Sequence, residues 1–240
     1  MPVALLVVVL GATVEAMRDV PATAPADALV VDVVGHQWWW EVRYRKEGVT
    51  TANELHVPVG RPIALRLTSA DVIHSFWVPE LGGKLDLLPD GTNTLVLQAD
   101  QPGEYRGECA EFCGLQHARM RITVVAEPAE QFASWAAAQQ QPAAEPAGVA
   151  ARRGQELFLG GDCATCHALR GTTAAATVGP DLTHVARRRT LGAGAAPNTP
   201  GDLADWVSDP HSTKSGVAMP ATDLAADELD AVLAYLGALE

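Results

Sequence analysis

The hydrophobic pattern of this chain changes its period once, and the change limits the chain to two kinds of structure. Before about Val125, apolar and polar residues alternate in short runs such as 29–34 and 63–68, which predicts strands. In the last segment the apolar residues recur at helical spacing, at Leu229, Val232, Leu233 and Leu236. We therefore expect an all-β sandwich or barrel followed by a small all-α domain.

A polar segment separates the two parts. Residues 139–148 contain two prolines and show no apolar period, which is typical of a linker. We therefore assign residues 28–138 to the β domain and residues 149–240 to the helical domain. Both have ordinary domain sizes.

The N-terminal residues 1–20 are expected to form the outer end of a transmembrane helix. The run from Pro2 to Val14 is uncharged, but its 13 residues are too few to span a bilayer, which takes about 20. No basic residue precedes the run, which disfavours a secretory signal peptide. Helical continuation through Arg18 would reach a membrane surface, and the beginning of the span would then be missing from this chain. The alternative is an apolar N-terminal element packed on the protein.

The charge of the chain disfavours one class of partner. Its 29 acidic residues outnumber 17 basic ones, for a formal net charge of -12. Because excess Lys and Arg must meet a phosphate backbone, we expect no nucleic-acid partner. An acidic face instead suits a basic protein partner.

The segment from Cys109 to Met120 gathers soft metal ligands. It reads C-A-E-F-C-G-L-Q-H-A-R-M and offers the thiols of Cys109 and Cys113, the imidazole of His117 and a thioether. Thiolate, imidazole and weak thioether ligands on a β scaffold are typical of copper electron-transfer sites. Two thiolates can bridge two copper ions, and His74 offers the second imidazole.

Zinc and a disulfide are the alternatives for this segment. A zinc site with two cysteines and two histidines would leave Met120 without a role, and the context lacks the helix of a zinc finger. A disulfide between Cys109 and Cys113 is possible outside the cytoplasm, but it would leave His117 and Met120 unexplained. We therefore favour copper.

A second cysteine pair indicates haem. Residues 163–167 read C-A-T-C-H, in which Cys163 and Cys166 would form thioethers to haem and His167 would take an axial position on the iron. A thioredoxin-like C-x-x-C motif would need a βαβ context and would give His167 no role.

Met219 is the expected second axial ligand. Gly179-Pro180-Asp181-Leu182 and Met219-Pro220 resemble loops of small class I cytochromes c, and His/Met ligation raises the reduction potential relative to bis-His ligation. The competing ligands would be His184 and His211. The resemblance covers the helical domain, and three residues match its helix-crossing contact, although core packing explains them equally well: Gly154, Phe158 and Tyr235.

The copper-type motif, with H-S-F-x-x-P at 74–79 and G-H-Q-W-W-W at 35–40, resembles subunit II of haem-copper cytochrome c oxidases. The resemblance covers residues 29–135 and implies a cupredoxin-like Greek-key barrel. It also implies a dinuclear copper A centre held by His74, Cys109, Cys113, His117, Met120 and the backbone carbonyl of Glu111. The Glu111 carboxylate would resemble the family's contribution to a magnesium site at the junction with subunit I.

Trp38 matches the family tryptophan through which electrons enter copper A. An aromatic ring beside a metal suits electron tunnelling, but the three consecutive tryptophans could instead be core or interface aromatics. Strand alternation predicts that Trp39 faces away from Trp38 and Trp40.

The fusion of these two domains resembles the cytochrome c-tethered, caa-type branch of the oxidases. It implies an electron-input subunit that passes single electrons from cytochrome c, including its own covalent haem c, to copper A and on to subunit I. The implied partners are subunit I, other oxidase subunits and a soluble or membrane cytochrome c. The implied location is the bacterial inner membrane, with both domains on the periplasmic side. The alternative is a freestanding periplasmic electron-transfer protein that serves a reductase.

Charge does not explain how the two domains meet. Residues 1–144 hold 17 acidic and 10 basic side chains and residues 145–240 hold 12 and 7, so the parts carry -7 and -5. Net attraction therefore cannot hold the domains together, and we expect the tether to supply the encounter. Arg187-Arg188-Arg189 could orient the pair, with a solvated basic loop as the alternative. The acidic residues near the copper motifs are Glu80, Asp86, Glu104 and Glu108.

Overall fold

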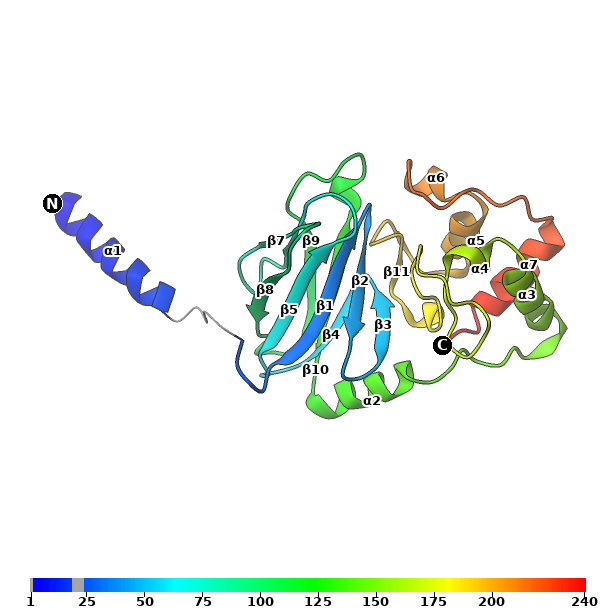
Figure 1. Ribbon diagram of the computed structural model, residues 1–240, viewed down its shortest axis with the longest axis horizontal. Helices are drawn as coiled ribbons and strands as arrows, with labels where there is room; N and C mark the ends of the chain where they lie inside the picture. Colours follow the sequence, from blue (N-terminus) through cyan, green and yellow to red (C-terminus); the bar gives the residue numbers. More distant parts are fainter. Residues whose placement is uncertain (1, 19–23) are drawn as a thin grey trace.

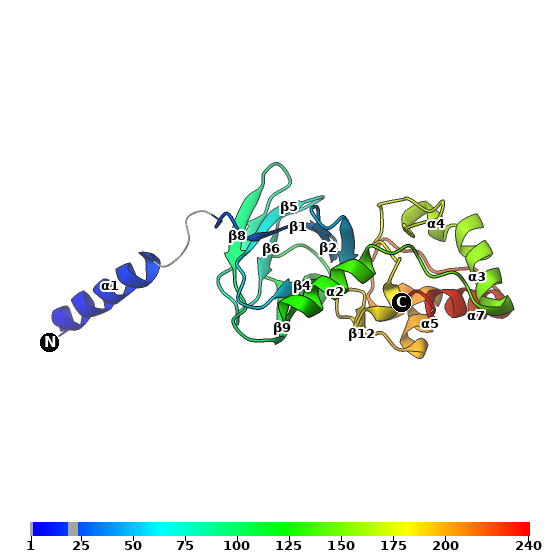
Figure 2. The same cartoon turned by 90° about the horizontal axis from the view of Figure 1, so that it is seen from below.

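The computed structural model describes residues 2–18 and 24–240, in three parts along the longest axis (Figures 1 and 2). An N-terminal helix lies at one end, a β sandwich in the middle and a helical domain at the other end. Residues 1 and 19–23 lie outside the described residues. Three of them, residues 1, 19 and 20, belong to the expected anchor segment 1–20.

The β domain consists of two five-stranded sheets. The first sheet has the order β3 (Val49–Ala52), β2 (Trp39–Tyr44), β1 (Leu29–His36), β5 (Ile63–Ser69) and β8 (Asn93–Leu97). The second has the order β4 (Glu54–Pro58), β10 (Arg121–Glu127), β9 (Gly103–Cys109), β6 (His74–Trp77) and β7 (Leu85–Leu87). The pairs β1–β5 and β4–β10 are parallel, and the other pairs are antiparallel.

Apolar residues on the inner faces of the sheets hold the sandwich together. Val31 of β1 is fully buried beside its register partner Leu65 of β5. Trp40 and Phe76 meet edge to face across the two sheets, with ring centroids 5.7 Å apart. The expected all-β domain is confirmed, as two packed sheets in place of a closed barrel.

The helical domain follows the sandwich along the chain. Helix α2 (Ala129–Gln139) packs on the sandwich, where Trp135 lies against Tyr44 with ring centroids 5.2 Å apart. The helical domain contains α3 (Gly148–Gly160), α4 (Cys163–Cys166), α5 (Pro200–Ser208), α6 (Pro210–Thr213) and α7 (Ala226–Leu236). Its short strands are β11 (Thr190–Leu191) and β12 (Ala196–Pro197), and the chain has 3-10 turns η1 (His117–Arg119) and η2 (Val185–Arg187). The expected change from strands to helices is confirmed.

Helices α3 and α7 cross at a glycine. A Cβ atom on Gly154 would lie 2.0 Å from the backbone oxygen of Ala231, so only glycine allows this approach. One turn further along α3, Phe158 packs on Tyr235 with ring centroids 6.1 Å apart. The helix-crossing contact expected for these residues is confirmed.

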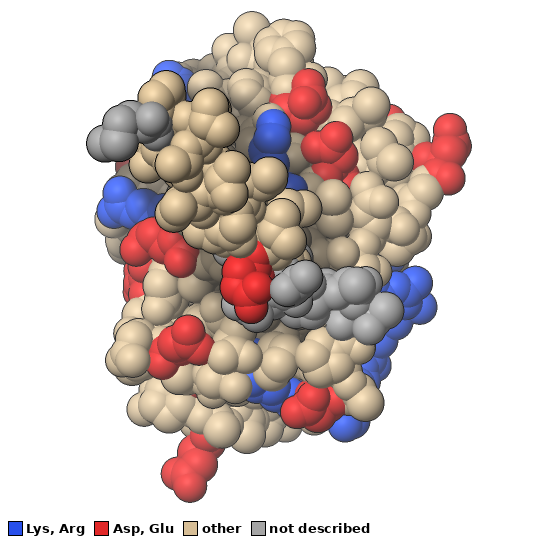
Figure 3. All heavy atoms as spheres, turned by 90° about the vertical axis from the view of Figure 1, so that its left-hand side faces the viewer, with Lys and Arg blue, Asp and Glu red and all other residues tan. Residues whose placement is uncertain are grey.

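The N-terminal helix α1 (Pro2–Arg18) extends away from both domains (Figure 1), and its apolar side chains at residues 3–10 are exposed. It is therefore not the packed element considered as the alternative. Within residues 2–18 and 24–240, no helix combines the length and apolar character needed to cross a membrane. Seen from the α1 end, acidic and basic side chains are interspersed over the surface (Figure 3).

The two domains are in direct contact, and Arg189 of the run Arg187-Arg188-Arg189 takes part in it. Arg189 donates from its backbone nitrogen to Glu54 Oε1 over 2.6 Å and from Nε to Glu104 Oε1 over 2.7 Å. Glu104 was among the expected acidic partners, whereas Glu54 was not. Glu80 and Glu108 line the crevice beside this contact.

Glu54 is the buried member of this contact, with 5% of its surface exposed. Burial acts to raise the pKa of Glu54, but hydrogen bonds from His56 and Arg189 outweigh it, so the pKa is lowered. His56 in turn lies 2.7 Å from Glu127 and stacks on Trp135. The contact between the domains therefore continues into the core of the sandwich.

Replacing Gly154 tests the helix crossing. We expect Gly154→Ala to destabilise the helical domain by about 2–3 kcal/mol, because the methyl group collides with α7. Gly160→Ala is the matched control, since nothing lies within 4 Å of a Cβ at the end of the same helix. Thermal unfolding of the haem-loaded chain measures the difference, and equal melting temperatures for the two variants would contradict the packing described.

Glu54→Gln tests the buried ion pair. At pH 7 the variant is expected to lose about 2 kcal/mol of unfolding free energy, because Arg189 then faces a neutral amide. Since the folded-state pKa of Glu54 is lowered, its stabilisation is complete above the ordinary value of 4.5 and is lost as the pH falls through the lowered pKa. Denaturant unfolding at pH 7 and at about pH 4 should therefore show the gap between wild type and variant shrinking. A gap that is the same at both pH values argues against this role.

Candidate metal and haem sites

Five side chains expected to bind metal meet at one end of the sandwich. His74 begins β6, Cys109 ends β9, and three further residues lie between β9 and β10. Because β6 pairs with β9, the sheet itself brings the histidine beside the first cysteine. The loop after β9 then carries Cys113, His117 and Met120 back over the same end.

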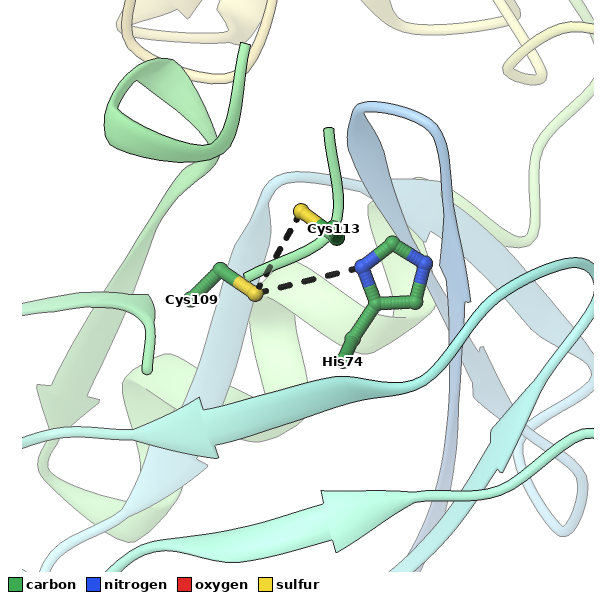
Figure 4. A group of neighbouring side chains, drawn as sticks. All are labelled: His74, Cys109 and Cys113. Carbon is green, nitrogen blue, oxygen red and sulfur yellow. Dashed lines mark hydrogen bonds between the residues drawn. The ribbon is translucent and has the colours of Figure 1, made fainter. Parts of the chain in front are cut away.

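Each thiol faces its own imidazole. Cys109 Sγ lies 3.9 Å from His74 Nδ1, and Cys113 Sγ lies 3.7 Å from His117 Nδ1. The two sulfurs are 3.7 Å apart (Figure 4), well beyond the ~2.05 Å of a disulfide bond. Both cysteines are therefore free thiols in this structure.

Two weaker donors complete the group, one beside each sulfur. Met120 Sδ lies 3.9 Å from Cys113 Sγ, and the backbone oxygen of Glu111 lies 3.2 Å from Cys109 Sγ. The Glu111 side chain itself is exposed. The donor set therefore consists of two sulfurs, two imidazoles, one thioether and one carbonyl.

The electrostatics of the thiol pair favour a bound cation. Contact with Cys113 lowers the pKa of Cys109 to about 3, and the same contact raises the pKa of Cys113. The close approach of the two sulfurs thus favours a thiolate at one of them, and the thiolate is the form of cysteine that binds a metal cation.

Neighbouring residues fix the ring of His74. Asp71 Oδ1 lies 2.8 Å from His74 Nε2, which leaves Nδ1 facing the thiols, and the Gln37 backbone N–H holds Asp71 from the other side. Burial acts to lower the pKa of His74, but hydrogen bonds with Cys109 and Asp71 outweigh it and the pKa is raised. A Cβ on Gly35 would lie 2.7 Å from the ring. Sequence reasoning missed Asp71 and Gly35; the i, i+3 spacing of Asp71 and His74 was the available signal.

The second cysteine pair borders a cavity of about 190 Å³ in the helical domain. Cys163, Cys166, His167 and Met219 all line it. His167 Nδ1 lies 2.8 Å from the Pro180 carbonyl, so the lone pair of Nε2 is available to bind a metal.

Burial lowers the pKa of His167, which favours the neutral imidazole that can bind iron. The close approach of the loop to this ring requires Gly179, where a Cβ would lie 2.6 Å from His167 Cε1. The competing histidines are placed differently. The ring nitrogens of His184 lie 2.8 and 3.3 Å from backbone carbonyls, and His211 is exposed on α6. Neither is among the described residues that line the cavity.

The β domain supplies one wall of the same cavity, through Trp38 and Trp39. Trp38 lies in the turn before β2, so the expected strand alternation does not apply to it, and Trp38 and Trp39 both line this cavity. Within β2 the burial fits the expected alternation, since Trp40 is fully buried and Trp39 is half-buried. Only Trp40 of the three lies in the core of the sandwich. Trp38 Nε1 donates to the Cys113 carbonyl over 2.9 Å. Trp38 therefore contacts the loop of the candidate copper ligands and lines the cavity that the second cysteine pair borders.

Comparisons with known proteins match the two domains separately and together. Residues 47–127 match the family model of the periplasmic domain of cytochrome c oxidase subunit II, and residues 151–240 match that of cytochrome c. Cytochrome c oxidase subunit 2 of Alkalihalophilus pseudofirmus is 36% identical over 245 residues, which cover 100% of this chain and 71% of that protein. Its counterpart in Bacillus subtilis is 32% identical over 258 residues, which cover 100% and 72%.

Among solved structures, the periplasmic domain of cytochrome oxidase subunit II from Bradyrhizobium japonicum is 30% identical, with a TM-score of 0.48. That match covers 49% of this chain and 97% of the solved one. The family assignment rests on the two relatives above, because each of them aligns with the whole length of this chain. The chain belongs to the cytochrome c oxidase subunit 2 family and is an electron-input subunit of such an oxidase.

Proposed function

We propose that a dinuclear copper A centre binds at the thiol pair, held by His74, Cys109, Cys113, His117, Met120 and the Glu111 carbonyl. The observation that carries this proposal is the separate imidazole beside each sulfur. A single copper ion needs only one thiolate, whereas two metal ions bridged by two sulfurs need one terminal imidazole each. Bound there, the copper pair would supply a one-electron carrier.

We assign the exposed Glu111 carboxylate to a magnesium site shared with the haem-copper subunit. Its backbone carbonyl faces Cys109 while its side chain is open to a partner. One residue would thus contact the copper centre through its main chain and the partner subunit through its side chain.

We further propose that Cys163 and Cys166 bind haem c through thioethers, with His167 and Met219 as axial ligands. The cavity suits this group because Arg188, which lines it, has a buried Nε with no hydrogen-bond partner among the described residues. A group that carries carboxylates, as haem does, would satisfy this donor. Haem would supply a second one-electron carrier.

Trp38 is the proposed point of electron entry to the copper site. Its ring borders the haem cavity, and its indole N–H holds the carbonyl of the ligand Cys113. Gln37 Nε2 donates to the same carbonyl over 2.7 Å, so two residues of one turn fix the ligand loop.

The remaining assignments follow the order of elements along the chain. Residues 1–20 form the outer end of a transmembrane helix, 28–138 the copper domain, 139–148 the linker and 149–240 the cytochrome c domain. The exposed apolar face of α1 supports the first of these. We place both soluble domains on the periplasmic side of the bacterial inner membrane, with subunit I and other oxidase subunits as partners and cytochrome c as donor.

Purification with the partner subunits tests this function. The chain should copurify from its source membrane with a large haem-copper subunit, and the complex should consume oxygen with reduced cytochrome c. A chain that is recovered alone and passes electrons to a reductase would instead support the freestanding electron-transfer protein.

Cys113→Ser tests the copper site. We expect the variant to lose the mixed-valence dinuclear copper signal in electron paramagnetic resonance, because a serine hydroxyl does not replace a bridging thiolate. Its haem spectrum should be unchanged. Cys163→Ser is the reciprocal control, since it should keep the copper signal and lose one haem thioether. A normal dinuclear signal from Cys113→Ser would refute the proposed ligand set.

A further inference from the structure

Lys214 is buried between the two domains, although lysine is almost never fully buried without partners. Only 1% of its surface is exposed, and it follows directly after α6. Lys214 is one of the residues that line the haem cavity. Neither of the proposed redox sites uses it.

Three backbone carbonyls surround its ammonium group. Nζ donates to the oxygens of Trp38 over 2.8 Å, Arg119 over 2.7 Å and Gly192 over 2.6 Å. Burial lowers the pKa of Lys214 to about 7, whereas the carbonyls favour the ammonium form, because only that form has three hydrogens to donate. Every hydrogen of the ammonium group therefore has a partner.

The three acceptors belong to different parts of the molecule. Trp38 is the proposed electron-entry residue, and Arg119 precedes the proposed ligand Met120. Gly192 belongs to the helical domain and lines the haem cavity. One side chain thus joins the entry residue, the copper-binding loop and the cavity wall.

The residues beside Lys214 also contact the loop that carries the proposed copper ligands. Gln116 Nε2 donates to the Ser215 backbone oxygen over 2.7 Å, and an Arg119 side-chain nitrogen donates to the Thr213 oxygen over 2.7 Å. A Cβ on Gly216 would lie 2.9 Å from Leu115 Cδ2, so the backbone approaches the copper loop closely there. We call residues 213–216 the docking segment, because it lies along the loop that carries the proposed copper ligands.

We propose that Lys214 is a positioning residue for electron entry: it holds the cytochrome c domain against Trp38 and the copper loop. We call the contact of its ammonium group with the three carbonyls the clasp. The inference rests on the proposed function of the two redox sites and adds what holds them together. If Lys214 served only the fold of its own domain, its acceptors would lie there, but two of the three lie in the β domain.

This clasp differs from the Arg189 contact at the other part of the interface. The ion pair of Arg189 with Glu104 is solvent-exposed, with the two side chains 38% and 56% exposed, so salt weakens that part of the contact, whereas the other partner, Glu54, is buried. Lys214 is screened from solvent by both domains, and the docked arrangement should therefore persist at high ionic strength.

Lys214→Met tests the clasp in the full chain loaded with copper and haem. Methionine fills similar space but leaves three carbonyls without a donor. After photoreduction of the haem, we expect transfer to copper to be about tenfold slower, because the docked population falls to what the tether alone maintains. Small-angle scattering should show a longer particle, while the copper and haem spectra stay unchanged. Lys46→Met, which removes an exposed lysine from a turn of the copper domain, is the matched control.

The possible outcomes distinguish a failure of the clasp from a failure of the proposed function of the two redox sites. Equal transfer rates and equal scattering for wild type and Lys214→Met would overturn the clasp alone. Absence of haem-to-copper transfer in the wild type would overturn the proposed function.

A wild-type measurement covers the case in which Lys214→Met does not retain haem. The chain has three lysines, Lys46, Lys84 and Lys214, so their ammonium groups can be distinguished by nuclear magnetic resonance in the copper-free, reduced chain. We expect the ammonium group of Lys214 to be protected from hydrogen exchange, whereas those of the exposed Lys46 and Lys84 exchange at the rate of free lysine. Three ammonium groups that exchange at the rate of free lysine would overturn the clasp.

Discussion

Trp38 links two sites that belong to different folds, because its indole N–H donates to the Cys113 carbonyl and the residue also lines the cavity of the helical domain. One side of Trp38 belongs to the copper-binding end of the sandwich, and the other borders the cavity beside the C-x-x-C-H motif. This position requires the helical domain to stay against the sandwich. Every functional assignment that involves both redox sites therefore depends on how the two domains are held together.

Buried polar contacts hold the two domains together, although both halves of the chain carry a net negative charge. Both halves of the chain are negative, so their long-range interaction is repulsive, but this repulsion is screened by salt and acts weakly at a distance. At the interface, Arg189 meets Glu54, and Lys214 meets three carbonyls. Local complementarity thus decides the arrangement, and the linker only has to keep the partner near.

The sequence predicted the candidate ligands that the structure brings together, because their spacing reflects chemistry that is local to each motif. It also predicted the change from strands to helices and the glycine crossing of α3 and α7. It suggested a contact of the Arg187-Arg188-Arg189 run with acidic residues such as Glu104, but it did not indicate Glu54 or Lys214 as members of the interface. Glu54 and Arg189 are separated by 135 positions, and nothing in either neighbourhood indicates the pairing.

Two further misses have a similar cause. Lys214 looks like a surface lysine in the sequence, since its burial exists only when the domains are docked. The tryptophans were interpreted by strand alternation, but the turn between β1 and β2 includes Trp38, which places it beside Trp39 at the cavity. Helical and strand periods describe single elements, whereas these residues are defined by where elements of different domains meet.

The central claim is that copper and haem lie close together across Trp38 in one docked molecule. The most direct measurement is the spin relaxation of the oxidised copper centre, compared between the full chain with oxidised haem and the same chain without haem. The account predicts that oxidised low-spin haem, which is paramagnetic, speeds the relaxation of the copper signal relative to the haem-free chain. Identical relaxation in both chains would mean that the two centres are far apart and would contradict the account.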